Sequence, residues 1–231
     1  KKDIQQTEIK IEIDEKTGRI SIYNNGTGVD IAKHPTVVDD EGNKLWIPSM
    51  IFGELLTSGN YKKGEKRTVG GKNGYGAKIV NIFSTEFNVE TCDSKTGKLY
   101  KQKFTNNMKT IHEPIIKKSK KEPYTKVSWM TDFKRFGISG FSDDMISLMV
   151  RRVYDIAGVT DPNISVYFNK NKIKIKSFID YVKLYPGSKK LYLKISDRWE
   201  IAIGVSENDK FEHISFVNGI ATPKGGIHVD V

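Results

Sequence analysis

Near the start of the chain, hydrophobic residues alternate with charged ones, which is the pattern of a β-strand with one buried face. Residues 7–13 read TEIKIEI and residues 19–23 read RISIY after a turn at 14–18, so the two runs predict a β-hairpin. Further strand-like runs joined by short turns predict a mainly antiparallel meander. These runs are 86–92 with 99–104, 110–116, 126–130, and 164–168 with 172–175.

A second pattern, with apolar residues every three or four positions, predicts helices. The clearest helix is expected at 143–157, where Asp143 and Asp144 occupy the first turn and Gly158 ends the run. Its apolar stripe is expected to pack in the core. Shorter helical runs are expected at 47–56, 77–84 and 178–185.

The character of the chain changes towards its end. Strand-like runs at 191–195, 199–205 and 211–217 follow one another without a long helix. This change predicts a domain boundary near residue 176, with one domain at 1–175 and the first strands of a second at 176–231.

Composition changes this picture mainly by exclusion. The 231 residues (26.2 kDa) are 37% hydrophobic and 29% charged. They contain no apolar run near the ~20 residues of a membrane span and no signal peptide at the amino end, so an intracellular protein is expected. Cys92 is the only cysteine, which excludes an intrachain disulfide and a Cys-rich zinc site. The four histidines have no metal-ligand spacing, and nothing indicates nucleophilic catalysis.

The charge balance is strongly basic. A net charge of +10 and a pI near 9.4 favour polyanionic partners such as nucleotides or nucleic acid. The densest basic run, KKSKK at 117–121, precedes Pro123 in a loop-like stretch. We interpret it as a solvated charged loop, with DNA contact as the less favoured alternative.

The run at 67–84, RTVGGKNGYGAKIVNIFS, places four glycines in a polar loop directly before a helical pattern. Glycines let backbone N–H groups approach an anion closely, so the run predicts a phosphate-binding loop. It is not a Walker A loop, because Gly76 is followed by Ala77 and Lys78, and its glycine order is not the Rossmann one. A plain surface turn is the alternative. The preceding stretch at 60–72 is a candidate lid.

A second loop follows the strand at 19–23. It reads NNGTGV at 24–29, so an Asn pair lies at a strand end beside glycines that allow a ligand to approach the backbone. An amide there is able to read the exocyclic amine of adenine. The alternative is an ordinary Asn-Gly turn.

These loops and several further blocks together carry a resemblance to a known family. The chain resembles, over nearly its whole length, the ATPase region of eukaryotic-type (type IIA) DNA topoisomerases, in the GHKL superfamily shared with gyrase, Hsp90 and MutL. The blocks are IYNNGTG at 22–28, IFGELLTSGNY at 51–61, GGKNGYGAK at 70–78, NIFS at 81–84, RRVYDIAG at 151–158, ISFVNGIAT at 214–222 and GGIHVD at 225–230.

The resemblance implies an α+β fold of the GHKL (Bergerat) type, a two-layer sandwich of a mixed, mainly antiparallel sheet with helices on one face, followed by part of a transducer domain. It implies an ATP-operated N-gate, in which Mg²⁺ and ATP drive homodimerisation and capture of double-stranded DNA, with no membrane partner. Such a protein would act in the nucleus if cellular and in the host cytoplasm if viral. The alternatives are another GHKL ATPase, such as a chaperone or mismatch-repair protein, and a nucleotide-binding module without turnover.

Site residues follow from the resemblance position by position. Asn24 takes the place of the residue that reads adenine, and Ser128 matches a hydroxyl that holds the base through water. The remaining ATP-binding residues are expected to be Gly26, Gly28 and Val29 beneath the base, Ile51 and Phe52 against the ring, Ser58, Gly59 and Asn60 at the ribose and phosphates, and Lys72, Asn73, Gly74, Tyr75, Gly76, Ala77 and Lys78 around the triphosphate.

The departures from the family pattern concern catalysis. The family's general-base Glu and Mg²⁺-holding Asn lie on a helix that precedes the strand beginning near Thr7, and its γ-phosphate Lys lies beyond Val231. No catalytic residue or metal ligand is therefore expected within the chain, and the 231 residues alone are expected to be inactive. At Gly59 the family usually has a second Ser, and the stretch at 185–191 is shorter than usual.

Overall fold

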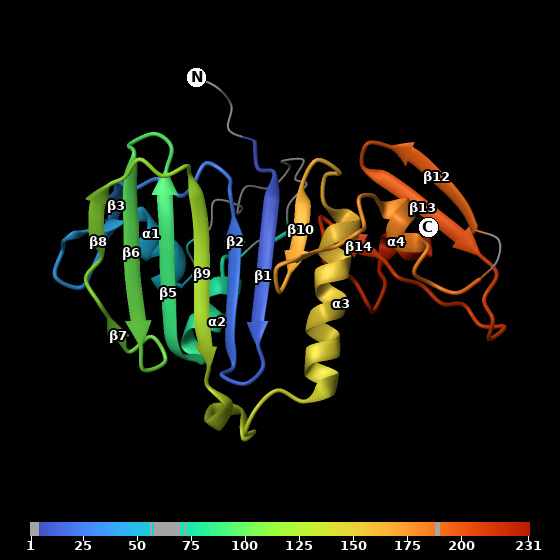
Figure 1. Ribbon diagram of the computed structural model, residues 1–231, viewed down its shortest axis with the longest axis horizontal. Helices are drawn as coiled ribbons and strands as arrows, with labels where there is room; N and C mark the ends of the chain where they lie inside the picture. Colours follow the sequence, from blue (N-terminus) through green and yellow to red (C-terminus); the bar gives the residue numbers. More distant parts are fainter. Residues whose placement is uncertain (1–4, 56, 58–69, 72, 188–189) are drawn as a thin grey trace.

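The computed structural model describes residues 5–55, 57, 70–71, 73–187 and 190–231 (Figure 1). Its main feature is a nine-stranded sheet in the order β11-β10-β1-β2-β9-β5-β6-β7, with β8 also paired to β6. All pairs are antiparallel except β1 with β10. The predicted mixed, mainly antiparallel sheet is thus confirmed. The strands are β1 Glu8–Asp14, β2 Arg19–Asn24, β5 Ser84–Asp93, β6 Lys98–Thr105, β7 Thr110–Ile111, β8 Ile115–Lys118, β9 Tyr124–Thr131, β10 Ser165–Phe168 and β11 Asn171–Lys172.

Most predicted strands form, with a few differences. The run expected at 110–116 is broken between β7 and β8, and the strand expected at 172–175 shortens to β11. A small separate hairpin, β3 (Lys33–Val38) with β4 (Lys44–Trp46), was not predicted. Its side chains are mostly exposed, so it lacks the hydrophobic alternation that marks a half-buried strand.

Helices cover one face of the sheet, as predicted. In Figure 1, α1 (Ile47–Gly53) and α2 (Gly76–Ile82) lie behind the strands. Strand register puts Ile20, Trp129 and Phe87 opposite one another, and alternation then assigns their neighbours two residues away to the same face. One cluster on this face holds Phe52, Phe87, Val89 and Phe104, with Ala77 of α2 packed against it.

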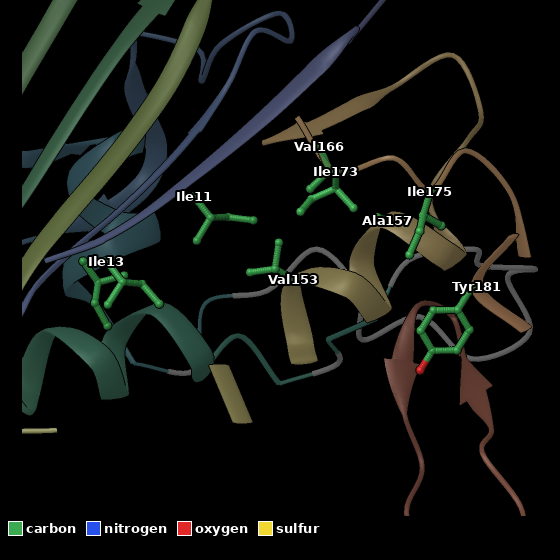
Figure 2. Close-up of a cluster of buried hydrophobic side chains, with 9 residues drawn as sticks. Ile11, Ile13, Val153, Ala157, Val166, Ile173, Ile175 and Tyr181 are labelled. Carbon is green, nitrogen blue, oxygen red and sulfur yellow. The ribbon is translucent and has the colours of Figure 1, made fainter. Parts of the chain in front are cut away.

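The longest helix, α3 (Asp143–Val159), packs on the same face at the β1 and β10 end. Figure 2 shows Val153 near Ile11 of β1 and Ala157 near Ile175, and Val166 of β10 belongs to the same cluster. The Ser142 hydroxyl accepts a hydrogen bond from Met145 N and caps the helix start. The helix runs past its predicted end at residue 157. A Cβ at Gly158 would lie 2.6 Å from Cγ of Tyr181, so this glycine leaves room for Tyr181 of the following helix to pack against the end of α3.

The remainder of the chain forms smaller elements. They are α4 Phe178–Val182, the hairpin β12 Lys190–Ser196 with β13 Trp199–Gly204, the hairpin β14 Phe216–Val217 with β15 Ile220–Ala221, α5 Ile227–Asp230 and the 3₁₀ turn Phe133–Phe136. The strand expected at 211–217 is therefore limited to its last two residues. Tyr181 of α4 is buried, and its ring meets Phe216 of β14 edge-on with centroids 5.7 Å apart, so both parts of the chain share one core.

Candidate functional site

The end of β2 carries a row of polar side chains on the helix face of the sheet. Asn24 is directly opposite Thr125 of β9, which is opposite Thr91 of β5. Thr91 Oγ1 lies 3.1 Å from Thr125 Oγ1. One step inward, Ile22 is flanked by β1 and β9 but remains 40% exposed. The helices therefore leave the centre of this face open beside Asn24.

The loop that follows Asn24 is held against the end of β5. Val29 N donates to Thr91 Oγ1 at 2.9 Å, and Ile31 N donates to Asp93 Oδ2 at 3.2 Å. Burial alone would raise the pKa of Asp93, but hydrogen bonds from Lys95 N, Thr96 and Ile31 N outweigh it and lower the pKa. A charged Asp93 thus anchors the loop. Gly28 approaches so closely that a Cβ would lie 2.0 Å from the Cys92 carbonyl oxygen.

Asn24 is itself oriented by this loop, since its Oδ1 accepts a hydrogen bond from Gly26 N at 3.4 Å. A neutral amide with its oxygen occupied by Gly26 keeps its NH₂ group for another acceptor. The predicted residues Asn24, Gly26, Gly28 and Val29 therefore lie together at one strand end.

Two helices border the open area. Phe52 of α1 belongs to a buried cluster, and Ile51 of α1, Ala77 of α2 and Val127 of β9 pack against that cluster. Val127 is the β9 neighbour of Ile22. Phe52 is buried against Phe87, with ring centroids 6.2 Å apart, and Asn81 Nδ2 donates to its carbonyl at 3.1 Å. Phe52 is thus chiefly a core residue, whereas Ile51 is only partly buried.

The glycine-rich loop leads into α2. Gly74 has φ +67° and Gly71 has φ +87°, conformations that favour glycine. A Cβ added at Gly76, the first residue of α2, would meet no heavy atom within 4 Å, so the backbone there faces open space. Tyr75 precedes the helix without a side-chain cap, and its ring is 39% exposed. Asn73 and Gly74 form a bend just before α2.

Lys78 does not extend towards the open area. Its side chain is buried, and its Nζ donates to the carbonyl and hydroxyl oxygens of Thr57 at 3.2 and 3.0 Å. Burial lowers the pKa of this amine. Lys78 therefore ties the first turn of α2 to the residue just before Ser58. The predicted residues Ser58, Gly59, Asn60 and Lys72, and all but residues 70–71 of the candidate lid, lie outside the described residues.

Ser128 is not brought together with the other predicted residues. It is opposite Ser21 and Asn88. Ser128 is three residues from Thr125 on β9, and because side chains alternate between the two faces of a sheet, its side chain lies on the face opposite to that of Thr125 and Asn24. Thr125 occupies the hydroxyl position beside Asn24. The alternation along β9 carries this signal, because Thr125 is two residues from Val127 and therefore shares its face of the sheet.

The described residues also limit which other sites are available. No three His, Cys, Asp or Glu side chains within them gather to hold a metal ion. Among the helices of the described part, none is long and apolar enough to cross a membrane.

Comparison with known proteins bears directly on this arrangement. No protein-family model matches the chain. DNA topoisomerase 2 of Acanthamoeba polyphaga mimivirus is 48% identical over 229 residues, and that of Arabidopsis thaliana is 45% identical over 240 residues. The ATPase region of Saccharomyces cerevisiae topoisomerase II superposes on 98% of the chain with a TM-score of 0.89 and 45% identity. The chain is homologous to the ATPase region of type II DNA topoisomerases.

A second solved structure gives a similar result. The ATPase and transducer domains of DNA topoisomerase II from Balamuthia mandrillaris match with a TM-score of 0.90 and 38% identity. The α+β architecture is therefore the GHKL fold of topoisomerase II, as the resemblance implied. The matches to the mimivirus and Arabidopsis proteins include 96% and 99% of this chain, but only 18% and 16% of those relatives. The chain likewise covers 59% of the yeast structure.

Proposed function

We propose that this chain is the ATP-binding part of the N-gate of a type II DNA topoisomerase. The observation that carries the proposal is the open centre of the sheet face at Ile22, bordered by the Asn24 strand end and by α2 with its glycine-rich loop. Homology to ATPase regions of topoisomerase II supports nucleotide as the ligand.

In this proposal each group of residues has a physical role. The Asn24 amide binds the adenine edge, and Gly28 keeps the loop flat enough for the base to lie against it. Backbone N–H groups between Gly74 and Ala77 bind phosphate oxygens, since glycine leaves the backbone accessible there. Thr125 replaces Ser128 as the hydroxyl near the base. Roles for Ser58, Gly59, Asn60 and Lys72 rest on the resemblance alone.

The proposed role in catalysis is binding and orientation. Phosphoryl transfer depends mainly on positioning and charge stabilisation, and ATP supplies the reactive phosphoanhydride when bound. The described residues form no carboxylate set that fits Mg²⁺. On the resemblance alone we assign the base and the metal ligand to the family helix expected before Thr7, and we propose that the 231 residues alone bind ATP without turning it over.

The partners follow from the same proposal. Two copies would associate through this region when ATP is bound and would enclose double-stranded DNA, as the N-gate of a topoisomerase does. The population shift would come from the ligand binding one conformation better than the other. We also propose that the ATP-binding domain spans 1–175 and that 176–231 begins the transducer.

Calorimetry with a non-hydrolysable ATP analogue tests the proposal. We expect Gly76→Val to abolish binding, because a branched side chain would occupy the space through which phosphate approaches the backbone. Asn24→Ala should weaken ATP binding by about tenfold, the scale of one lost hydrogen bond to a buried base, while leaving bare triphosphate binding unchanged.

Ile203→Ala is a suitable control, since Ile203 is exposed on β13, outside the proposed site. Unchanged affinity in Gly76→Val, or equal losses for ATP and for triphosphate in Asn24→Ala, would contradict the proposed geometry. Turnover would be measured separately, with and without the upstream helix. Turnover by the 231 residues alone would show that the base lies elsewhere.

A further inference from the structure

The hairpin of β14 and β15 lies against Gly70, at the start of the glycine-rich loop. Its tip, Asn218 and Gly219, has φ of +51° and +76°, the two positive values of the tight type I′ turn that Asn-Gly favours. Thr222 N donates to the Ser215 carbonyl at 2.8 Å and closes the base of the hairpin. The hairpin is therefore a compact, locally determined unit.

Gly70 lies directly against this hairpin. A Cβ added at Gly70 would be 2.2 Å from Cδ1 and 2.5 Å from Cγ1 of Ile220, and 3.3 Å from the Asn218 carbonyl oxygen. Real Cβ atoms do not approach so closely, so a side chain at position 70 would require Ile220 to move. The first glycine of the phosphate-binding loop proposed above thus contacts a residue 150 positions later in the chain.

The far side of the hairpin is fixed to α3. Arg152 Nη2 donates to the Gly219 carbonyl oxygen at 2.7 Å, and Nη1 of the same guanidinium lies 3.7 Å from Asp155 Oδ2. Asp155 is buried and also accepts a hydrogen bond from the Tyr181 hydroxyl at 2.6 Å. Figure 2 shows the Tyr181 side chain from the neighbouring core cluster. A charge-assisted bond to the tip of a tight turn holds that turn in one place.

We propose that the β14–β15 hairpin positions the glycine-rich loop for triphosphate binding, with Ile220 as the positioning residue and Arg152 holding the hairpin in place. Ile220 and Arg152 act through the loop and do not contact the nucleotide. The inference rests on the proposed function, because it assumes that the loop at Gly70–Gly76 binds phosphate. It adds that residues after 176 set the affinity of that loop.

A double-mutant cycle on ATP affinity tests the positioning role in the full-length protein. Ile220→Ala removes the support without adding a clash and should weaken ATP binding by about threefold. Gly70→Ala should also weaken ATP binding by about threefold, because the added methyl group displaces the flexible end of the Ile220 side chain. In the Ile220→Ala background the Gly70→Ala change should have almost no further effect, because the contact through which it acts is gone.

The readout that separates positioning from general destabilisation is the affinity for adenosine, measured by competition against a fluorescent ATP analogue. The base binds at the Asn24 end, so adenosine affinity should change by less than twofold in every variant. Ile203→Ala is the control for removing an exposed isoleucine. Arg152→Gln should lower ATP affinity in the same direction as Ile220→Ala.

Two results would overturn the inference: additive losses in the double variant, or parallel losses for ATP and adenosine. Melting temperature would be recorded for each protein. If Gly70→Ala does not fold, unchanged ATP affinity in Ile220→Ala still refutes the positioning role. Failure of the unaltered protein to bind ATP would instead refute the proposed function, so the two failures are distinguishable.

Discussion

Gly28→Ala probes the closest backbone approach in the candidate site. The added methyl group would lie 2.0 Å from the Cys92 carbonyl oxygen and 2.8 Å from its carbonyl carbon. Cys92 is paired on both sides, with Leu99 of β6 and Tyr124 of β9, so this backbone cannot yield. The loop after Asn24 must lift away from β5 instead.

The magnitude follows from what the loop loses. Lifting breaks the hydrogen bonds of Val29 N to Thr91 and of Ile31 N to Asp93, each contributing about 1 kcal/mol to stability. Gly28 also has φ +76°, where an alanine costs about 1 kcal/mol more than glycine. The free energy of unfolding should therefore fall by about 3 kcal/mol, the sum of these three effects.

Gly42→Ala supplies a matched control, because Gly42 has φ +84° but a Cβ there would meet no atom within 4 Å. It should lose only the conformational part, about 1 kcal/mol. Urea denaturation of the two variants and the unaltered chain measures the difference. Equal losses of unfolding free energy in Gly28→Ala and Gly42→Ala would refute the reasoning, since they would mean that the contact with Cys92 costs nothing.

Two further predictions concern pH and the assignment of the hydroxyl. Hydrogen bonds from Lys103 and Asn88 lower the pKa of Glu86 from 4.5 to about 2, so its stabilising contribution is full above pH 4.5 and is lost as the pH falls towards 2. Glu86→Gln should lower the free energy of unfolding by about 1–2 kcal/mol at pH 7, after allowance for solvent screening. Urea titrations should show a smaller loss at pH 2 than at pH 7. An equal loss at both pH values would contradict this role of the Glu86 charge. Thr125→Val should weaken ATP binding severalfold while Ser128→Ala leaves it unchanged, and calorimetry giving the reverse order would return the role to Ser128.

Local pattern was sufficient for most of the sheet and for α3. The alternation at 7–13 and 19–23 identifies β1 and β2 because one face of each strand is buried. Alternation of buried and more exposed residues likewise marks β5 and β6. The β3–β4 hairpin lacks such a face and was missed. Gly158 is typical of a helix end in local sequence but lies inside α3, where it packs against Tyr181, a contact that no local pattern contains.

The candidate site was predictable where its residues are adjacent in sequence. The groups at Asn24–Val29 and Gly74–Lys78 are evident as loops in the sequence, but the contacts of Val29 with Thr91 and of Lys78 with Thr57 depend on residues distant in the chain. Ser128 lies on the other face of the sheet from Asn24, because it pairs with Ser21 and Asn88 and strand alternation separates it from Thr125. The contact of Gly70 with Ile220 spans most of the chain, so only the folded structure reveals it.

The one parallel pair in the sheet has a consequence for biosynthesis. Glu8 of β1 pairs with Ser165 of β10, so β1 must wait for most of the chain to leave the ribosome before its second neighbour arrives. Until then β1 is an unprotected edge, open to association with strands of other nascent chains. Such distant pairing also slows folding. Completion of this sheet therefore depends on the timing of translation as well as on the stability of the finished fold.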